Sequence, residues 1–111
     1  MTRYRINPGE YRHKIIIEQK TYAQNDYGEE IDEWVKVIEV YAAIYPISGK
    51  EFFAAETASS EVTHKINIRY VPSIKPDMRV IFNDRVFHIQ SVINFQERNV
   101  VLQLMCKEII R

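Results

Sequence analysis

THKINIRYVPSIKPDMRVIFNDRVFHIQSVINFQERNVVLQLMCK, residues 63–107, reads as four consecutive β-strands separated by turns. Along residues 63–70 apolar and polar side chains alternate, and this period of two predicts a strand with one buried face. Pro72 and Pro76 then interrupt the pattern, because proline has no N–H group to donate to a neighbouring strand. The alternation therefore predicts a strand over 63–70 that ends in a connecting loop.

The rest of this stretch predicts an antiparallel meander. Residues 79–82 and 86–93 flank Asn83-Asp84-Arg85, a short polar link typical of a hairpin turn. Residues 94–99 form the next turn, and apolar residues alternate again from Val100 onward. Cys106 shares the face of the apolar residues, so we expect a buried and unreactive thiol.

The N-terminal half predicts two further strands. Residues 11–20 and 34–44 are rich in β-branched and aromatic residues, and residues 22–33 between them read as a polar hairpin loop. Ser48 and Glu51 form a capping box that predicts a short helix over residues 49–59. We therefore expect a mainly β fold, a small antiparallel β-barrel of five to seven strands with one short α-helix inserted between the second and third main strands.

Length and composition bound the remaining possibilities. With 111 residues the chain is expected to form one domain, residues 1–111, of which residues 1–10 are polar and read as a flexible arm. It has no apolar run near the ~20 residues that a membrane span needs and no signal-peptide core. A single cysteine cannot form an internal disulfide, which suits a reducing cytoplasm.

Charge is unevenly distributed although the net charge is zero. Residues 1–20 hold five basic and two acidic residues, residues 21–61 two and nine, and residues 62–111 eight and four. The acidic block is either a solvated surface or a face that meets a basic partner or repels a polyanion. Its candidate acidic loop contains Asp26, Glu29, Glu30, Asp32 and Glu33. Their spacing does not match a calcium-binding loop, so we expect no metal there.

Enzymatic motifs are absent from the sequence. The three histidines fall one per predicted strand, and three glycines cannot build a phosphate-binding loop. We therefore expect no catalytic, metal or cofactor site. A single-stranded nucleic-acid-binding module is the alternative, because four basic residues lie near three aromatic ones. These residues are Lys65, Arg69, Arg79 and Arg85, with Tyr70, Phe82 and Phe87. The alternation, however, favours a core position for the aromatic residues.

From Gly9 to Glu108, the sequence resembles the phage head-tail adaptor or head-completion (head-closure) proteins of long-tailed bacteriophages and prophages. The resemblance rests on the number, order and spacing of short matches. They are Tyr11-Arg12-His13-Lys14-Ile15 leading into Ile17-Glu18-Gln19, Asp26-Tyr27-Gly28 before Trp34, Tyr41-Ala42-Ala43-Ile44, Pro46-Ile47-Ser48-Gly49-Lys50-Glu51, Thr63-His64-Lys65-Ile66 with Ile68-Arg69-Tyr70, Pro76-Asp77-Met78-Arg79-Val80, Phe87-His88-Ile89, Asn94 and Glu97-Arg98-Asn99. The family usually has Gly then Leu before the Arg-His pair, where this chain has Gly9-Glu10-Tyr11.

The resemblance implies a structural virion protein made in the bacterial cytoplasm. Such proteins form a ring, commonly of twelve copies, below the portal and its adaptor, where they close the DNA-filled head and dock the tail. Double-stranded DNA would pass through the channel without specific binding, and no membrane is involved. A neighbouring tail-completion protein of similar shape remains an alternative. By position, the channel-closing stopper would lie in Pro46–Glu61, with candidate residues Pro46, Ile47, Ser48, Gly49, Lys50, Glu51, Phe52, Phe53, Glu56 and Glu61.

Overall fold

The structure is a computed structural model that describes residues 9–47 and 62–110. Its elements are the strands β1 (His13–Gln24), β2 (Glu30–Pro46), β3 (His64–Arg69), β4 (Arg79–Phe82), β5 (Arg85–Asn94) and β6 (Val101–Ile109), with the 3-10 turn η1 (Phe95–Glu97) between β5 and β6. Within the described ranges, no helix has the length and apolar character needed to cross a membrane.

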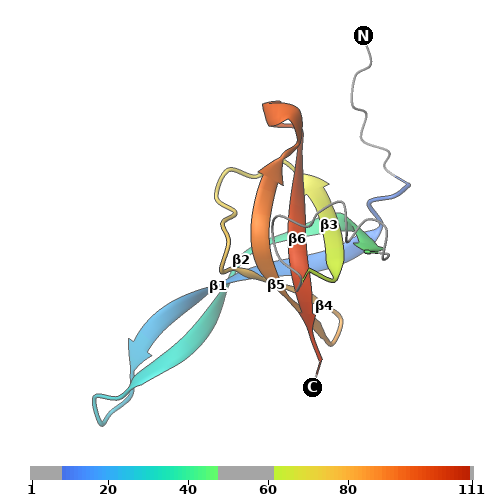
Figure 1. The fold of residues 1–111 in the computed structure, drawn as a ribbon. Helices are drawn as coiled ribbons and strands as arrows, with labels where there is room; N and C mark the ends of the chain where they lie inside the picture. The colour runs from blue at the N-terminus through green and yellow to red at the C-terminus, as the bar shows by residue number, and fades with distance from the viewer. Residues whose placement is uncertain (1–8, 48–61, 111) are drawn as a thin grey trace.

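The six strands form one closed antiparallel ring in the order β1-β2-β3-β6-β5-β4 (Figure 1). The ring closes where Ile16–Glu18 of β1 pair with Arg79–Ile81 of β4. This arrangement confirms a mainly β fold with antiparallel strands, whose number lies within the predicted range. The predicted helix over residues 49–59 lies outside the described residues.

The core fills the inside of the ring, and the predicted alternation places Ile66 and Ile68 in it, although Asn67 between them is buried as well. Ile66 and Ile68 of β3 are fully buried, whereas Arg69 is exposed. Phe87 is the largest fully buried side chain. The other fully buried large side chains come from three further strands, β1, β4 and β6: Ile15, Ile17, Val80, Val101, Leu104 and Cys106. Burying one such side chain is worth roughly 1.5–3 kcal/mol, so these residues dominate the stability of the ring.

The β1–β2 hairpin is longer than predicted. The turn occupies only the residues between Gln24 and Glu30, so the prediction of a loop over 22–33 is wrong at both ends. The two strands continue as a paired ribbon well past the ring, from the Gln19↔Val35 pair to the Gln24↔Glu30 pair (Figure 1). We call residues 19–35 the hairpin arm and the closed ring of strands the body.

A register shift lies near the point where the arm leaves the body. Ile17 pairs with Ile38 but Glu18 pairs with Lys36, so Val37 is an extra residue in β2. Such a bulge bends the strand and increases its twist. We infer that this bulge helps the ribbon turn out of the ring, which is why the arm stands clear of the body.

Candidate functional site

The tip of the hairpin arm is a tight turn held by one asparagine. The Asn25 side-chain oxygen accepts hydrogen bonds from the backbone N–H groups of Tyr27 (2.9 Å) and Glu29 (3.0 Å). Gly28 has a φ of 80°, a left-handed conformation that is strained for other residues. Asn25 and Gly28 therefore define the tip, and they hold the acidic residues around it in one geometry.

The acidic residues of the arm lie on both sides of this turn. Asp26 and Glu29 belong to the turn, whereas Glu30, Asp32 and Glu33 are part of β2, which corrects their assignment to a loop. Asp32 forms an ion pair with Lys20 at 3.1 Å, and the hydrogen bond to Asp32 raises the pKa of Lys20. Across the described ranges, no three His, Cys, Asp or Glu side chains are grouped as metal ligands.

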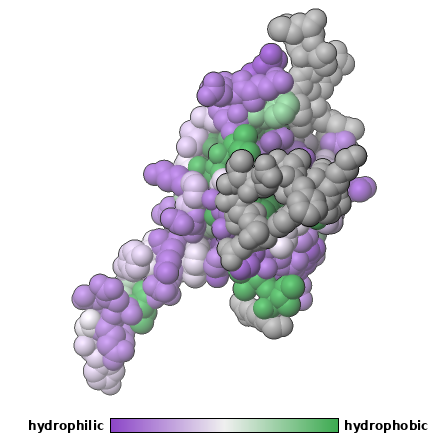
Figure 2. Space-filling view, in the orientation of Figure 1, coloured by the Kyte–Doolittle hydropathy of each residue, from purple (hydrophilic) through white to green (hydrophobic). Residues whose placement is uncertain are grey.

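Large apolar side chains accompany these charges on the arm. Tyr27 is 88% exposed and Tyr22 is 73% exposed, and Ile31 and Val35 are each 39% exposed. Figure 2 shows the projecting arm as a mostly hydrophilic surface with a small apolar patch. A surface that combines tyrosines, aliphatic side chains and one sign of charge is typical of a protein interface rather than of an inert loop.

Arg79 of β4 fastens the arm to the body. Its Nε atom donates a 2.7 Å hydrogen bond to Glu18 of β1, and its guanidinium lies 4.2 Å from the centre of the Trp34 ring on β2. Ring closure brings together residues that are far apart in the sequence, and no local pattern pointed to them. The planar guanidinium of Arg79 forms an ion pair with Glu18 and also stacks on Trp34. These two contacts make the base of the arm a rigid joint.

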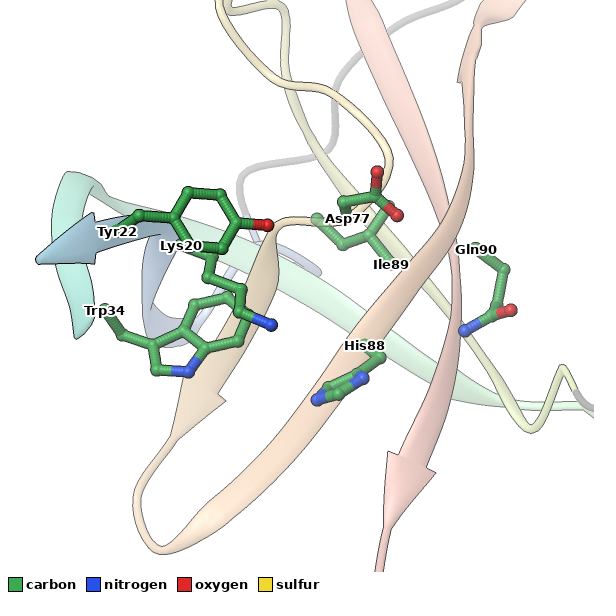
Figure 3. Close-up of a pocket in the computed structure, with 7 residues that line it drawn as sticks. All are labelled: Lys20, Tyr22, Trp34, Asp77, His88, Ile89 and Gln90. Atoms are coloured by element: carbon green, nitrogen blue, oxygen red, sulfur yellow. The ribbon is translucent and has the colours of Figure 1, made fainter. Parts of the chain in front are cut away.

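A groove of about 490 Å³ opens beside this joint (Figure 3). It is lined by Lys20, Tyr22 and Trp34 from the arm and by Asp77, His88, Ile89 and Gln90 from the body. Partial burial lowers the pKa of His88, and Arg79, Lys107 and Lys20 lower it further, so these surroundings favour the neutral ring. The groove therefore combines apolar ring surface from the arm with polar side chains of both the arm and the body.

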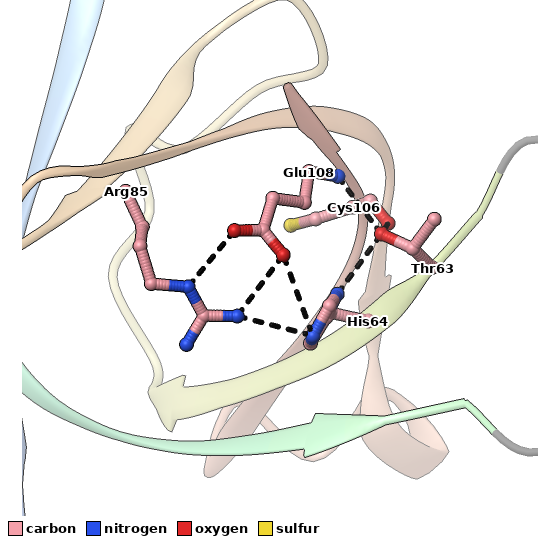
Figure 4. A network of polar contacts seen from close by, with 5 residues as sticks. All are labelled: Thr63, His64, Arg85, Cys106 and Glu108. Atoms are coloured by element: carbon pink, nitrogen blue, oxygen red, sulfur yellow. Dashed lines mark hydrogen bonds and ion pairs between the residues drawn. The ribbon is translucent and has the colours of Figure 1, made fainter. Parts of the chain in front are cut away.

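A second polar cluster lies where the chain re-enters the structure after residue 61. The Glu108 carboxylate accepts two hydrogen bonds from Arg85, of 2.9 and 3.0 Å (Figure 4). The Glu108 N–H donates a 2.8 Å bond to Thr63 Oγ1, and Thr63 N–H donates a 2.8 Å bond to Cys106 O. We call Thr63, His64, Arg85 and Glu108 the clamp, since they attach the start of β3 to β6.

His64 completes the clamp as a neutral side chain. Burial is the main cause that lowers the pKa of His64; the Glu108 carboxylate raises this pKa, and the Arg85 guanidinium lowers it. The contacts assign the proton to Nδ1, which donates to Thr63 Oγ1 at 2.9 Å, while Nε2 faces the Arg85 guanidinium at 3.4 Å. No local sequence pattern indicated this cluster, because its members come from three strands and a loop.

The structure separates two groups of predicted site residues. The arm acids lie at the start of β2, whereas Pro46 ends the same strand, so at ~3.3 Å per residue the two sites are roughly 40 Å apart. The arm acids therefore lie far from the end of β2 that leads to residue 48. Of the candidate stopper residues, only Pro46 and Ile47 are described, and residues 48–61 lie outside the described part.

The aromatic residues considered for nucleic-acid stacking belong to the core. Phe87 is fully buried, and Tyr70 and Phe82 pack against the core cluster. Stacking on bases requires an exposed ring face. The interpretation of these residues as core is thus confirmed. Cys106 is also fully buried, and burial raises its pKa to about 12, so the thiol stays protonated at neutral pH.

The chain matches a known protein family over most of its length. Residues 6–109 match the family profile described as phage head completion protein. The chain belongs to this family. A head completion protein is a structural part of the virion, and family membership supports the same coarse role, a virion component at the head-tail connection, for this chain.

Solved structures share the fold at low sequence identity. A protein from Shigella flexneri 2a, determined in solution, superposes with a TM-score of 0.77 at 23% identity, over 93% of this chain and 96% of that one. A chain of the virion of a native gene transfer agent particle superposes with a TM-score of 0.64 at 22% identity, over 98% and 100%. No curated protein gives a significant match. These likenesses show that this head completion protein shares its fold with a component of an assembled particle.

Proposed function

We propose that the protein assembles as a ring, of twelve copies in the virion, below the portal and its adaptor. There it closes the DNA-filled head and provides the docking surface for the tail. The match to the head completion family over residues 6–109 carries this proposal. The small closed barrel of strands is consistent with it, because a rigid body can present loops and an arm to several neighbours at once.

We infer that residues 46–61 form the element that closes the channel. Ile47 N–H donates a 2.9 Å hydrogen bond to Thr63 O, so the intervening residues leave and re-enter the body at one point. A segment whose flanking residues adjoin can change conformation without disturbing the sheet that carries it. The clamp attaches Thr63 to β6, which supports a role for the sheet as the rigid support of this element.

Deletion of the coding sequence from its phage or inducible prophage tests the role directly. We expect electron micrographs of the lysate to show heads without DNA and without tails, beside free tails. Restoring the gene on a plasmid should return infectious particles. Tailless heads that retain their DNA would instead indicate a tail-completion protein, and normal infectious particles without the gene would contradict the proposal.

A second experiment examines the charge of the proposed stopper. If Glu51 and Glu56 line the channel, their carboxylates repel the DNA phosphates and let the genome pass without binding. We expect the double variant Glu51→Lys, Glu56→Lys to slow DNA ejection from purified virions. Glu97→Lys, which reverses the charge of an exposed residue in the body, is the matched control. Equal ejection rates for both variants would mean that the stopper acids are only solvated surface.

A further inference from the structure

The β1–β2 ribbon carries opposite charges at its two ends. Five carboxylates lie in the arm, against one lysine, at the end where β1 finishes and β2 begins. At the other end, basic side chains lie on the outer surface of β1 and β3. A ribbon with this polarity can bind a second identical ribbon head to tail, since the acidic end of one copy complements the basic end of the next.

The basic end is a defined patch. Lys14 pairs across the strands with Tyr41; Arg12, which directly precedes β1, and Arg69, at the end of β3, are exposed. Tyr41 is 57% exposed, and Lys14 lies 3.7 Å from Glu39. In the described part of the chain, Arg12 and Arg69 form no ion pair. We call Arg12, Lys14, Tyr41 and Arg69 the root patch.

Among the described residues, no third strand pairs with the outer part of the arm. Beyond the Glu18↔Arg79 pair its strands pair only with each other, and an isolated two-stranded hairpin is at best marginally stable in water. Its tip also cannot reach the root patch of the same copy. Lys14 and Gln24 lie at opposite ends of the extended β1, ten residues or roughly 33 Å apart.

We propose that the acidic arm of one copy docks on the root patch of the neighbouring copy. The contact joins two different surfaces, so it repeats from copy to copy and closes when the rotation between copies allows a ring. Carboxylates of the arm face Arg12 and Arg69, while Tyr22 or Tyr27 packs beside Tyr41. This inference rests on the proposed ring and names the element that links its subunits.

The chemistry of the two surfaces predicts how the contact behaves. Exposed ion pairs are individually weak and are screened by salt, so the charges set orientation and register while the tyrosines supply contact area. Such a contact is weak between two free copies and strong when many copies are held on one platform, because each bound neighbour raises the effective concentration. Assembly on the head is therefore the relevant setting for a test.

Charge reversal with rescue tests the proposal in the virion. An arm variant carries Glu29→Lys and Glu30→Lys, a patch variant carries Arg12→Glu and Arg69→Glu, and a third chain carries all four substitutions. Each complements the deletion strain in place of the wild-type gene. We expect the first two to lower the infectious titre by roughly tenfold or more, and the combined variant to recover most of it, because opposite charges meet again.

Controls make every outcome decisive. Glu97→Lys and Lys75→Glu reverse exposed charges outside both surfaces and should leave the titre unchanged. All variants should unfold at the wild-type temperature, since the altered side chains are exposed. Loss in the arm variant alone would assign the arm to a different virion protein and overturn the proposal, as would a combined variant no better than the other two. Heads that close normally without the gene would instead overturn the proposed function.

A crosslink supplies an independent measurement. A chain with Glu29→Cys and Arg69→Cys should form disulfide-linked ladders in purified virions under mild oxidation, whereas a chain with Glu97→Cys and Arg69→Cys should not. Cys106 does not interfere, because it is fully buried. Monomers only, from virions of normal infectivity, would contradict the contact.

Discussion

At the residue scale, the clamp makes a pH-dependent contribution to stability. The hydrogen bond with Arg85 is the main cause that lowers the pKa of Glu108 below its usual 4.5. When the pKa of a carboxyl group is lower in the folded protein than in the unfolded chain, the group stabilises the fold at any pH above its pKa in the unfolded chain. This contribution is lost as the pH falls through the pKa that the group has in the folded protein. We expect Arg85→Ala to cost about 1 kcal/mol at pH 7, a modest figure because Arg85 is partly exposed.

The pH series supplies the decisive comparison for Arg85. Chemical unfolding of the wild type and Arg85→Ala should give a difference that is constant from pH 7 to about pH 5 and shrinks below pH 4.5. Arg98→Ala, which removes an exposed arginine outside the clamp, should show no difference at any pH. A difference that persists unchanged at pH 3 would mean that Arg85 acts through packing on Phe87, whose ring lies 4.9 Å from its guanidinium.

Cys106 gives a second residue-level prediction. Because the thiolate is the reactive form and burial raises the pKa of this thiol to about 12, we expect no labelling by a thiol reagent at pH 8 in the folded protein. Full labelling should follow unfolding in guanidinium chloride. Rapid labelling of the native protein would show that β6 opens readily, and this result would contradict its position in the core.

At the scale of elements, a strand could be predicted from the sequence where one of its faces lies against the core. Ile66 and Ile68 face the core of the body and alternate with polar residues, so the sequence shows a period of two in β3, although Asn67 is buried as well. The arm is exposed on both sides, so residues such as Tyr22 and Asp32 show no such period, and they were read as a loop. The clamp and the Arg79 joint were not predictable, because each depends on which strands close the ring.

The independence of the arm from the body is testable through its turn. Asn25→Ala removes two side-chain hydrogen bonds at the tip, so backbone amides of the arm should exchange with deuterium faster. The melting temperature should hardly change, since the arm contributes nothing to the core. Asn94→Ala is the matched control, because Asn94 accepts a 3.1 Å bond from the Asn99 N–H in the β5–β6 turn. Its effect should be confined to that turn, and protection lost throughout the body in Asn25→Ala would contradict the separation.

At the scale of the whole molecule, the seam between β1 and β4 determines whether the ring stays closed. The paired region is short, yet it carries Arg79, whose contacts with Glu18 and Trp34 join the seam to the arm. Loss of a partly buried, charge-assisted hydrogen bond and of a stacked guanidinium costs about 1–2 kcal/mol. We therefore expect Arg79→Ala to lower the free energy of unfolding by that amount and to increase amide exchange in β4 and in the arm together.

Arg79→Lys separates the two contacts of this side chain. Lysine keeps the charge beside Glu18 but has no planar group to stack on Trp34, so we expect an intermediate stability. Exchange in the arm should rise as in Arg79→Ala, while exchange in β4 should stay closer to that of the wild type. If both variants loosen β4 but leave the arm unchanged, the joint is not what orients the arm, and the direction in which the arm meets a neighbouring copy must come from the bulge at Val37 instead.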